Sequence, residues 1–336
     1  MSTITLLTTF APTNVGNLFI DLGSAYTLTA ALPEANIQTV SGLPRILGEF
    51  QHPKIMTLNR MFSFGLRKLL NKRKLFDIRS RIGNLLSHLI LPPRNYLDLA
   101  LYFKSDYVVI SGCVLTEFSV THFGKTLFNL KRKGAKIIFN GVGGSSYSEF
   151  EIYTVRKFLK KIRPYAFISR DEISFENYGD LARFSFNGVD CAFFLKDFFH
   201  PVKLDIPKYI VLTFDKLPEP KIQFNGLIIR THHKFWGKLP RRFFNKPNVL
   251  ISDSPFDYLN VYANAACLLT DRVHACVAAV SYGTPCKLYY KTKRALLFDR
   301  IGLSDITKKV IHPSDYSYSL EKEKEKHLSF LSDILH

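Results

Sequence analysis

An arginine and a histidine separated by one residue, Arg272 and His274, are the strongest candidates for chemistry in this sequence. A guanidinium stays charged and binds phosphate or carboxylate, and a helix N-terminus adds free N–H groups and a favourable dipole. A histidine titrates near neutral pH and can transfer a proton. The pair therefore predicts an anion site with acid–base chemistry. The alternative is structural: an ion pair of Arg272 with Asp271 or another acid, and a hydrogen-bonded histidine at a helix start.

The residues around this pair predict a strand that passes directly into a helix. Residues 267–269 form a short apolar run, which is typical of a buried strand. Thr270 and Asp271 follow with the side-chain oxygens that begin helices, and Gly283 marks the helix end. Open α/β sheets bind ligands where strands pass into helices, so the pair lies where a binding site is expected.

The composition fits a protein of two domains with an anionic partner. The chain has 336 residues, which is the length of two domains of roughly 150 residues each. Of these residues 46% are apolar, enough for two hydrophobic cores. Its 46 basic and 28 acidic residues give a net charge of +18. Such a charge favours nucleic acid, a phosphorylated small molecule or an anionic membrane. No recognised nucleic-acid-binding motif accompanies it, so we expect no nucleic-acid partner.

The sequence shows no pattern of a signal peptide or a membrane-spanning helix, and this, together with the cysteine spacing, predicts the compartment. No Lys or Arg precedes Arg45, and no apolar run reaches the roughly 18 residues that a spanning helix needs. The five cysteines are widely spaced and form no CxxC pair, which favours free thiols in a reducing compartment. We therefore expect a cytoplasmic protein, either in solution or peripheral at the inner face of the membrane.

Strand-like and helical segments alternate along the chain, which predicts parallel, doubly wound sheets. Residues 141–144 are predicted as a glycine loop after a strand, and 184–198 as the passage to a second domain. We place an N-terminal domain at 1–190, a second at 191–317 and a C-terminal helix at 318–336. The predicted strands are 4–10, 37–40, 107–111, 136–140 and 165–169 in the first domain, and 209–214, 226–230, 249–252, 267–270 and 286–290 in the second.

The segment 60–82 differs in character from the rest of the first domain. Its Arg and Lys residues alternate with Leu and Phe, a pattern that favours an amphipathic helix at an anionic membrane surface. The alternative is a solvated helix that covers its own domain.

Other candidate residues lie at comparable turns. Asn14, Gly16 and Asn17 follow the first predicted strand in a weak phosphate-loop-like turn, which lacks both GxGxxG and the Walker sequence. Gly16 would alternatively supply only the turn geometry. Arg170 and Asp171 open a helix after the strand 165–169. Asp171 would orient Arg170 or act as a second base, and the structural alternative is that it caps the helix.

Two further basic motifs have a functional and a structural interpretation. The adjacent His232 and His233 point in opposite directions on a strand and lack a spaced carboxylate partner. We therefore predict no metal site there, and a surface or acceptor-side loop instead. Lys291 follows the strand 286–290, close enough to reach a bound phosphate, although an ordinary solvated lysine is the alternative.

Four elements in order resemble the polysaccharide pyruvyl transferase family, over roughly residues 4 to 300. The last is similar to the family's Ser/Thr-Asp-Arg-Leu-His-Ala and is the most specific. The chain departs from the pattern at Asp215, where relatives often carry an arginine-bearing strand end, and Arg230 is the candidate substitute. The four elements are Asn14-Val-Gly-Asn17, Val109-Ile-Ser-Gly112, Ile168-Ser-Arg-Asp-Glu-Ile-Ser174 and Leu269-Thr-Asp-Arg-Val-His-Ala275, with Gly283-Thr-Pro285 beyond.

The resemblance implies two Rossmann-like domains in a glycosyltransferase-B-like arrangement. It implies transfer of the pyruvyl group of phosphoenolpyruvate to two hydroxyls of one sugar, as a cyclic ketal, with release of phosphate. The acceptor would be a polysaccharide, a glycan or a lipid-linked glycan precursor, and no cofactor is required. The alternatives are a nucleotide-sugar-dependent glycosyltransferase of the same architecture and a non-catalytic relative associated with glycans or membranes.

The resemblance also implies roles for particular residues. Arg170 and Arg272, one in each domain, would clamp the donor's phosphate and carboxylate, and His274 would transfer a proton. The implied substrate-binding residues are Asn14, Gly16, Asn17, Gly112, Asp171 and Lys291.

Overall fold

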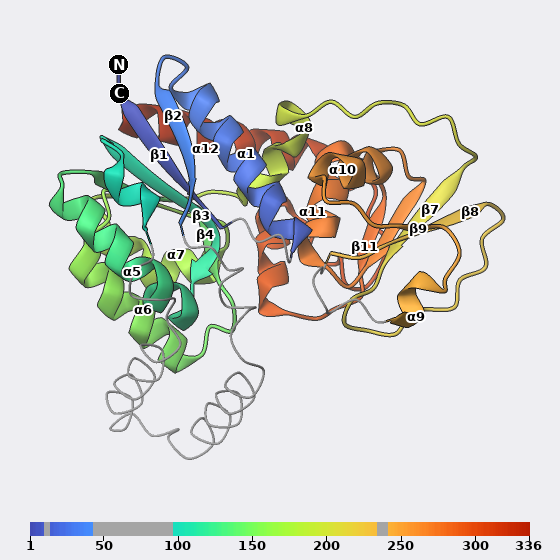
Figure 1. Cartoon of the computed structure of the whole chain (residues 1–336). Helices are drawn as coiled ribbons and strands as arrows, with labels where there is room; N and C mark the ends of the chain where they lie inside the picture. Colours follow the sequence, from blue (N-terminus) through green and yellow to red (C-terminus); the bar gives the residue numbers. More distant parts are fainter. Residues whose placement is uncertain (10–13, 43–96, 234–240) are drawn as a thin grey trace.

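The computed structural model describes residues 1–9, 14–42, 97–233 and 241–336, which form two parallel sheets flanked by helices (Figure 1). The predicted basic segment 60–82 lies outside the described residues. Within these residues the first sheet has the strand order β2-β1-β3-β4-β5-β6. Its strands are β1 (Thr3–Thr8), β2 (Asn36–Ser41), β3 (Tyr107–Leu115), β4 (Lys136–Gly144), β5 (Ala166–Ser169) and β6 (Phe184–Asn187).

The second sheet follows after residue 208. Among the described residues its strand order is β11-β10-β7-β8-β9, and each strand pairs with its neighbours in parallel. The apolar runs of its central strands are buried on both faces, as in other sheets with helices on both sides. Its strands are β7 (Tyr209–Thr213), β8 (Leu227–Thr231), β9 (Val249–Leu250), β10 (Cys267–Thr270) and β11 (Cys286–Leu288).

Helices cover the faces of both sheets and link the two domains. In Figure 1, α1 lies between the two sheets, and α12 runs back across the molecule to the first domain. No helix of the described part of the chain is both long and apolar enough to cross a bilayer. The helices are α1 (Val15–Ala31), α5 (Glu117–Arg132), α6 (Glu149–Ile162), α7 (Glu172–Tyr178), α8 (Leu195–Phe198), α9 (Arg241–Phe244), α10 (Pro255–Ala263), α11 (Val273–Tyr282) and α12 (Ser317–Leu335).

The parallel α/β fold predicted from the sequence is confirmed, and two local predictions are wrong. Residues 141–144 are not a glycine loop but the end of β4, where the backbone continues beside β3 and β5 after a shift of register. Residues 184–187 do not belong to a linker but form β6, a short edge strand beside β5. Its four residues are at most half-buried, so its sequence lacks the apolar run that identifies central strands.

Each sheet reverses its strand order once. In the first sheet β2 and β3 lie on opposite sides of β1, and in the second β8 and β10 lie on opposite sides of β7. The loops that leave the strands at such a reversal diverge to opposite faces and open a crevice, in which open α/β sheets bind their ligands. A binding site is therefore expected between the end of β1 and the ends of β7 and β10.

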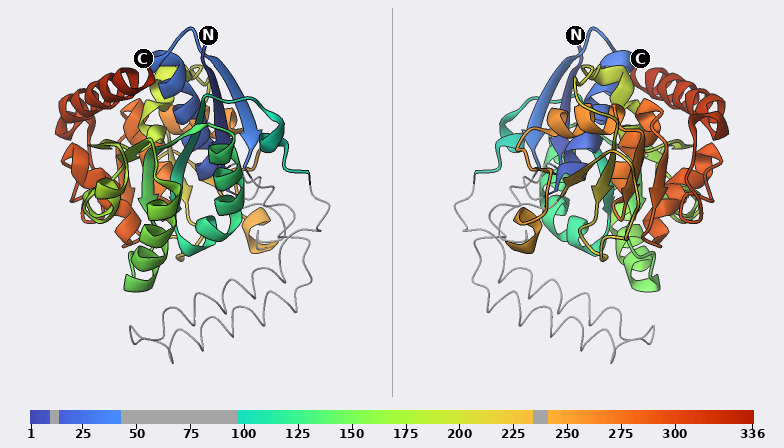
Figure 2. Two further views of the ribbon diagram at one scale, coloured as in Figure 1. Left: turned by 90° about the vertical axis from the view of Figure 1, so that its left-hand side faces the viewer. Right: turned by 90° about the vertical axis from the view of Figure 1, so that its right-hand side faces the viewer.

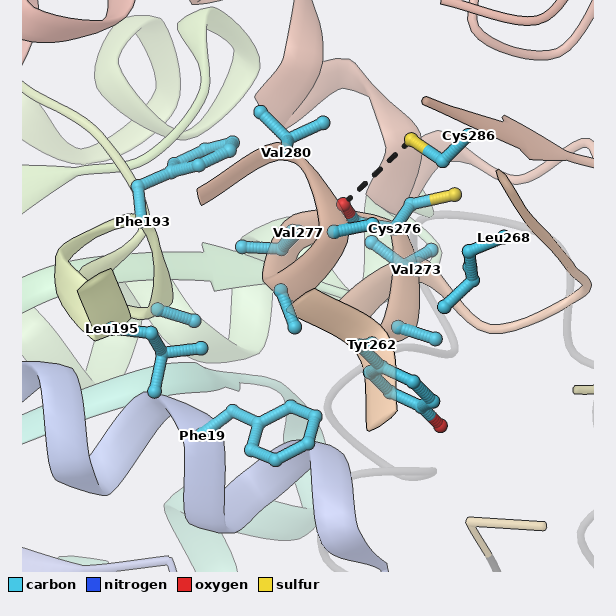
Figure 3. Close-up of a cluster of buried hydrophobic side chains, with 14 of the residues drawn as sticks. Phe19, Phe193, Leu195, Tyr262, Leu268, Val273, Cys276, Val277, Val280 and Cys286 are labelled. Atoms are coloured by element: carbon cyan, nitrogen blue, oxygen red, sulfur yellow. Dashed lines mark hydrogen bonds between the residues drawn. The ribbon is translucent and has the colours of Figure 1, made fainter. Parts of the chain in front are cut away.

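One hydrophobic cluster crosses the boundary between the two domains. Phe19 of α1 packs edge-on against Tyr262 of α10, with ring centroids 6.3 Å apart. Phe193 and Leu195 from the connection between the sheets join the same cluster, together with Val277 of α11 (Figure 3). Because these side chains are buried, the contact between the domains is apolar at its centre and contributes to folding in the way a domain core does.

The C-terminal helix anchors this arrangement on the other side. Helix α12 lies along one side of the molecule (Figure 2), and Leu331 and Leu335 pack into the core beneath the first sheet. His327 of the same helix is fully buried. Its Nδ1 accepts from the N–H of Val189 (3.3 Å) and its Nε2 lies 2.8 Å from Oδ1 of Asn140. Since Nδ1 is an acceptor, the ring is neutral and donates from Nε2.

The burial of His327 predicts a loss of stability in mild acid. Burial lowers the pKa of His327 from 6.5 to about 4, so the unfolded chain binds this proton more readily than the folded one. The free energy of unfolding should fall as the pH drops from about 6.5 toward 4, by up to about 3 kcal/mol from this group. Urea unfolding of wild type and His327→Gln at pH 7 and pH 4.5 tests this. An equal loss of stability in both proteins would contradict it.

Candidate anion-binding active site

A pocket lies where the N-termini of α1 and α11 meet, one from each domain. It is therefore placed at the strand-order reversals of both sheets. Gly16 of α1 allows this approach, because a Cβ there would lie only 3.0 Å from Cβ of His274. The residues that line the pocket are Gly16, Lys216, His233, Arg272, Val273, His274, Thr292 and Arg294.

The two helix N-termini differ in how their N–H groups are satisfied. Helix α1 is capped by Asn14, whose Oδ1 accepts from the N–H of Gly16 (3.3 Å). Helix α11 has Arg272 at its N-cap position, and that side chain makes no capping bond. The first N–H groups of a helix have no acceptor within it, and the residues that carry them here, Val273 and His274, line the pocket. An anion in the pocket would satisfy them and interact favourably with the helix dipole.

Arg272 connects the two domains at the rim of the pocket. Its Nη2 donates to Oδ1 of Asn14 (2.8 Å), and its Nε lies 3.4 Å from Oδ2 of Asp215. Only 13% of the side chain is exposed, and this burial lowers its pKa from the usual value. Asn14 and Asp215 thus fix the orientation of the guanidinium. A fixed orientation is needed for the planar guanidinium to bind an anion through two hydrogen bonds.

Asp271 is not the partner of Arg272. Its carboxylate accepts from three successive backbone N–H groups, those of Asp215 (3.1 Å), Lys216 (2.6 Å) and Leu217 (2.7 Å). Asp271 therefore holds the loop after β7, and this loop brings Asp215 to Arg272. The structural alternative named Asp271 or another acid as the partner of Arg272, and that acid is Asp215.

A second arginine at the pocket, Arg294, is not among the residues that the sequence motifs single out. It follows β11, and its Nε is buried without a hydrogen-bond partner among the described residues. One signal in the sequence could have identified it. The backbone N–H groups of both pocket arginines donate to a threonine hydroxyl two residues earlier, Arg272 to Thr270 (2.9 Å) and Arg294 to Thr292 (3.3 Å). The same Thr-x-Arg turn thus occurs after β10 and after β11.

Two predicted basic residues lie elsewhere. Lys291 is exposed and does not line the pocket, as in the structural alternative considered for it. Arg230, the suggested substitute for a family arginine, forms an ion pair with Glu219 (2.9 Å) and also does not line the pocket. Lys216 supplies a further cation, with its Nζ 3.8 Å from the ring centroid of Tyr290.

Arg170 is buried behind the pocket rather than exposed in it. Its Nη1 lies 2.6 Å from Oδ2 of Asp190, while Nε and Nη2 have no hydrogen-bond partner among the described residues. A Cβ on Gly143 would collide with Arg170, so this glycine makes room for the guanidinium. The structure thus does not bring Arg170 and Arg272 together as a two-sided clamp. The two arginines that share the pocket are Arg272 and Arg294.

Asp171 has a structural partner on each carboxylate oxygen. Oδ1 caps α7 by accepting from the N–H of Ser174 (2.8 Å), and Oδ2 accepts from the hydroxyl of Tyr147 (2.7 Å). Gly112 has a positive φ of 86° and packs against Ile20 of α1, outside the pocket. Neither residue lines the pocket.

Asn17 also makes contacts within the first domain. Its Nδ2 donates to the carbonyl of Thr9 (3.2 Å), and its Oδ1 accepts from Nδ2 of Asn14 (3.2 Å). Asn17 does not line the pocket, but it supports the residue that contacts Arg272. Of the first-domain candidates, Gly16 lines the pocket itself and Asn14 contacts it through Arg272.

His274 lines the pocket with only 5% of its surface exposed. Its Nε2 lies 3.4 Å from Oδ2 of Asp190, the same oxygen that contacts Arg170. Burial lowers the pKa of His274, although Asp190 acts in the opposite direction. The neutral ring is therefore favoured near pH 7, and one of its nitrogens is an available base.

The two adjacent histidines lie just after β8 and both are buried, so the surface position predicted for them is wrong, whereas the acceptor-side position stays a prediction. Their rings contact different partners. Nδ1 of His232 lies 3.4 Å from Asp215, and Nε2 of His233 lies 2.8 Å from the hydroxyl of Tyr262. His233 lines the pocket, and burial lowers its pKa well below the usual value. Within the part of the chain that the structure describes, no cluster of three or more His, Cys, Asp or Glu could hold a metal ion.

Comparison with solved structures supports the glycosyltransferase-B-like arrangement of two Rossmann-like domains. A UDP-N-acetylglucosamine 2-epimerase superimposes with a TM-score of 0.51 at 11% identity, over 98% of this chain and 95% of that chain. The UDP-GlcNAc 2-epimerase of Neisseria meningitidis gives a TM-score of 0.48 at 12% identity, over 99% and 94%. At 11% identity, the similarity to the first of these structures shows the fold alone.

Comparison of the sequence shows the family. No curated protein matches this sequence. The family model for polysaccharide pyruvyl transferase matches residues 59–286, which is more than half of the chain. This region includes Arg170, Arg272 and His274, whereas Asn14 and Gly16 precede it. The chain belongs to the polysaccharide pyruvyl transferase family.

Proposed function

We propose that the protein transfers the pyruvyl group of phosphoenolpyruvate to two hydroxyls of one sugar and so forms a cyclic ketal with release of phosphate. Family membership supports a transferase that acts on a glycan, and the donor and the ketal are our proposal. One observation carries it: Arg272, Arg294 and the uncapped N-terminus of α11 converge on one pocket. Phosphoenolpyruvate has a phosphate and a carboxylate, so it needs several positive groups held on rigid backbone.

The residues of the pocket fit the charges of this donor. The N–H groups of Val273 and His274 would bind the phosphate, as helix N-termini do in other proteins. Arg272 and Arg294 would then neutralise the phosphate and the carboxylate. His233, Val273 and His274 in the pocket wall are buried, and a charged contact beside buried groups is stronger than one at the open surface.

His274 would transfer the protons that the reaction requires. Protonation of carbon 3 makes carbon 2 of the donor electrophilic, and the first sugar hydroxyl then adds to carbon 2 and loses its proton. The second hydroxyl displaces phosphate from carbon 2 and completes the ketal. A histidine with one free nitrogen can accept the hydroxyl proton or, once protonated, supply the proton to carbon 3. The acceptor would be a polysaccharide, a glycan or a lipid-linked precursor.

Release of inorganic phosphate from phosphoenolpyruvate tests the proposal. The purified protein is incubated with phosphoenolpyruvate and a panel of pyranosides with adjacent or 4,6-related hydroxyl pairs, and the sugar product is analysed by mass spectrometry. We expect phosphate release that depends on the sugar, with a product heavier by one pyruvyl ketal. A parallel arm with nucleoside diphosphate sugars tests for glycosyl transfer. Release of the nucleoside diphosphate there, with phosphoenolpyruvate left intact, would identify a glycosyltransferase instead.

A further inference from the structure

A buried carboxylate links Arg170 to His274. Asp190 is fully buried at the start of the 3₁₀ helix Cys191–Phe194, in the connection between the two sheets. Its Oδ1 accepts from the N–H of Ala192 (2.9 Å). Its Oδ2 lies 2.6 Å from Nη1 of Arg170 and 3.4 Å from Nε2 of His274. The three side chains thus form a row from the interior of the first domain to the pocket.

We propose that Asp190 is a positioning residue, which holds His274 with its proton on Nε2 so that Nδ1 is the nitrogen that exchanges protons with substrate. Arg170 then serves the reaction through Asp190 and does not itself bind the donor. This inference rests on the proposed function, because it assigns the working atom of the proton-transfer residue.

The tautomer follows from the charge of Asp190. Burial opposes ionisation, but the guanidinium of Arg170 and the contact with His274 hold the pKa of Asp190 below its usual range. An ionised carboxylate can only accept hydrogen bonds, so Nε2 of His274 must carry a hydrogen to contact it. In the neutral ring the second nitrogen, Nδ1, is then the base. A carboxylate that orients a catalytic histidine in this way is known from unrelated hydrolases.

The charges around His274 act in opposite directions. Asp190 favours the protonated ring, whereas Arg170 from the first domain and Arg294 from the segment after β11 disfavour it. His233 also lies close enough to interact with it. Removing Asp190 and removing Arg170 should therefore shift the titration of His274 in opposite directions. A purely structural role of the buried pair would instead make both variants lose activity without a directed shift.

The pH dependence of kcat in Asp190→Asn and Arg170→Gln tests the inference. Asparagine still accepts from Ala192 but carries no charge. We expect the limb of the profile that reports His274 to move to lower pH in Asp190→Asn and to higher pH in Arg170→Gln. In Asp190→Asn kcat should fall about 10²–10⁴-fold because the amide permits the other tautomer. KM for phosphoenolpyruvate should change little in both variants. Shifts in the same direction, or a large rise in KM for Arg170→Gln, would overturn the inference.

A measurement on the wild-type protein keeps the test decisive if either variant fails to fold. The ¹⁵N chemical shifts of the two ring nitrogens of His274 distinguish a protonated Nε2 from a protonated Nδ1. We expect the proton on Nε2, and a proton on Nδ1 in the neutral ring would refute the inference. This experiment needs no turnover, so its failure can be told apart from a failure of the proposed function.

Discussion

Replacing His274 by glutamine is expected to lower kcat for phosphate release about 10²–10⁴-fold, the usual range for the loss of a general acid–base residue. Glutamine fills a similar volume and can still hydrogen-bond to Asp190, but it cannot take up or release a proton. KM for phosphoenolpyruvate should change little, because the two pocket arginines and the helix N–H groups remain. Steady-state kinetics of wild type and variant measure both constants.

His200 provides a matched control for this substitution. It is an exposed histidine outside the pocket, so His200→Gln should retain the wild-type kcat. Near-wild-type turnover by a correctly folded His274→Gln protein would remove His274 from the proton-transfer role. A rise in KM with unchanged kcat would make it a ligand of the donor instead.

Replacing Arg294 or Arg272 by alanine is expected to weaken binding of phosphoenolpyruvate about 10–100-fold in each case. A hydrogen bond to a charged group contributes roughly 1.5–3 kcal/mol, which corresponds to this range of affinity. Removing Arg294 should have the cleaner effect, because its Nε has no partner among the described residues. Arg272 in addition contacts Asn14 and Asp215. Isothermal titration with phosphoenolpyruvate measures the loss.

Lys291 is the matched control for Arg294, since it lies three residues earlier in the same segment but is exposed. Lys291→Ala should bind phosphoenolpyruvate as wild type does. Arg272→Lys keeps the charge but loses the planar guanidinium. Its affinity for phosphoenolpyruvate should therefore lie between those of the wild type and Arg272→Ala. Equal affinity for the donor in Arg294→Ala and Lys291→Ala would place the phosphate or the carboxylate elsewhere.

The sequence predicted which residues stand at strand ends, but not which strand ends face each other. Arg170 follows β5, and two strands, β3 and β4, separate β5 from the order reversal at β1. Arg294 follows β11, which lies next to β10 in the second sheet. Local spacing does not contain this order, because strand neighbours are decided by packing between segments far apart in the chain. The segment containing Arg272 and His274 was predictable, because its strand, helix start and helix end are all local features.

The two histidines that follow β8 illustrate a second limit. The sequence predicts that they point in opposite directions, and the rings of His232 and His233 do contact different partners. The burial of these two side chains is not predictable from the sequence, because polar side chains are buried only where the fold supplies hydrogen-bond or ion-pair partners. Those partners, Asp215 and Tyr262, come from two other segments of the second domain. A buried polar residue therefore cannot be told from an exposed one by its own neighbours in the sequence.

The apolar cluster that joins α1 to α11 has a consequence for how a bulky acceptor enters. A hinge motion that moved the two domains apart would separate Phe19 from Tyr262 and expose both rings to water. Exposure of two aromatic side chains costs roughly 3–6 kcal/mol, so an open state would be populated less than about one per cent of the time. Separating the two halves is therefore costly. We expect a glycan chain to gain access by rearrangement at the rim of the pocket rather than by a hinge between the two domains.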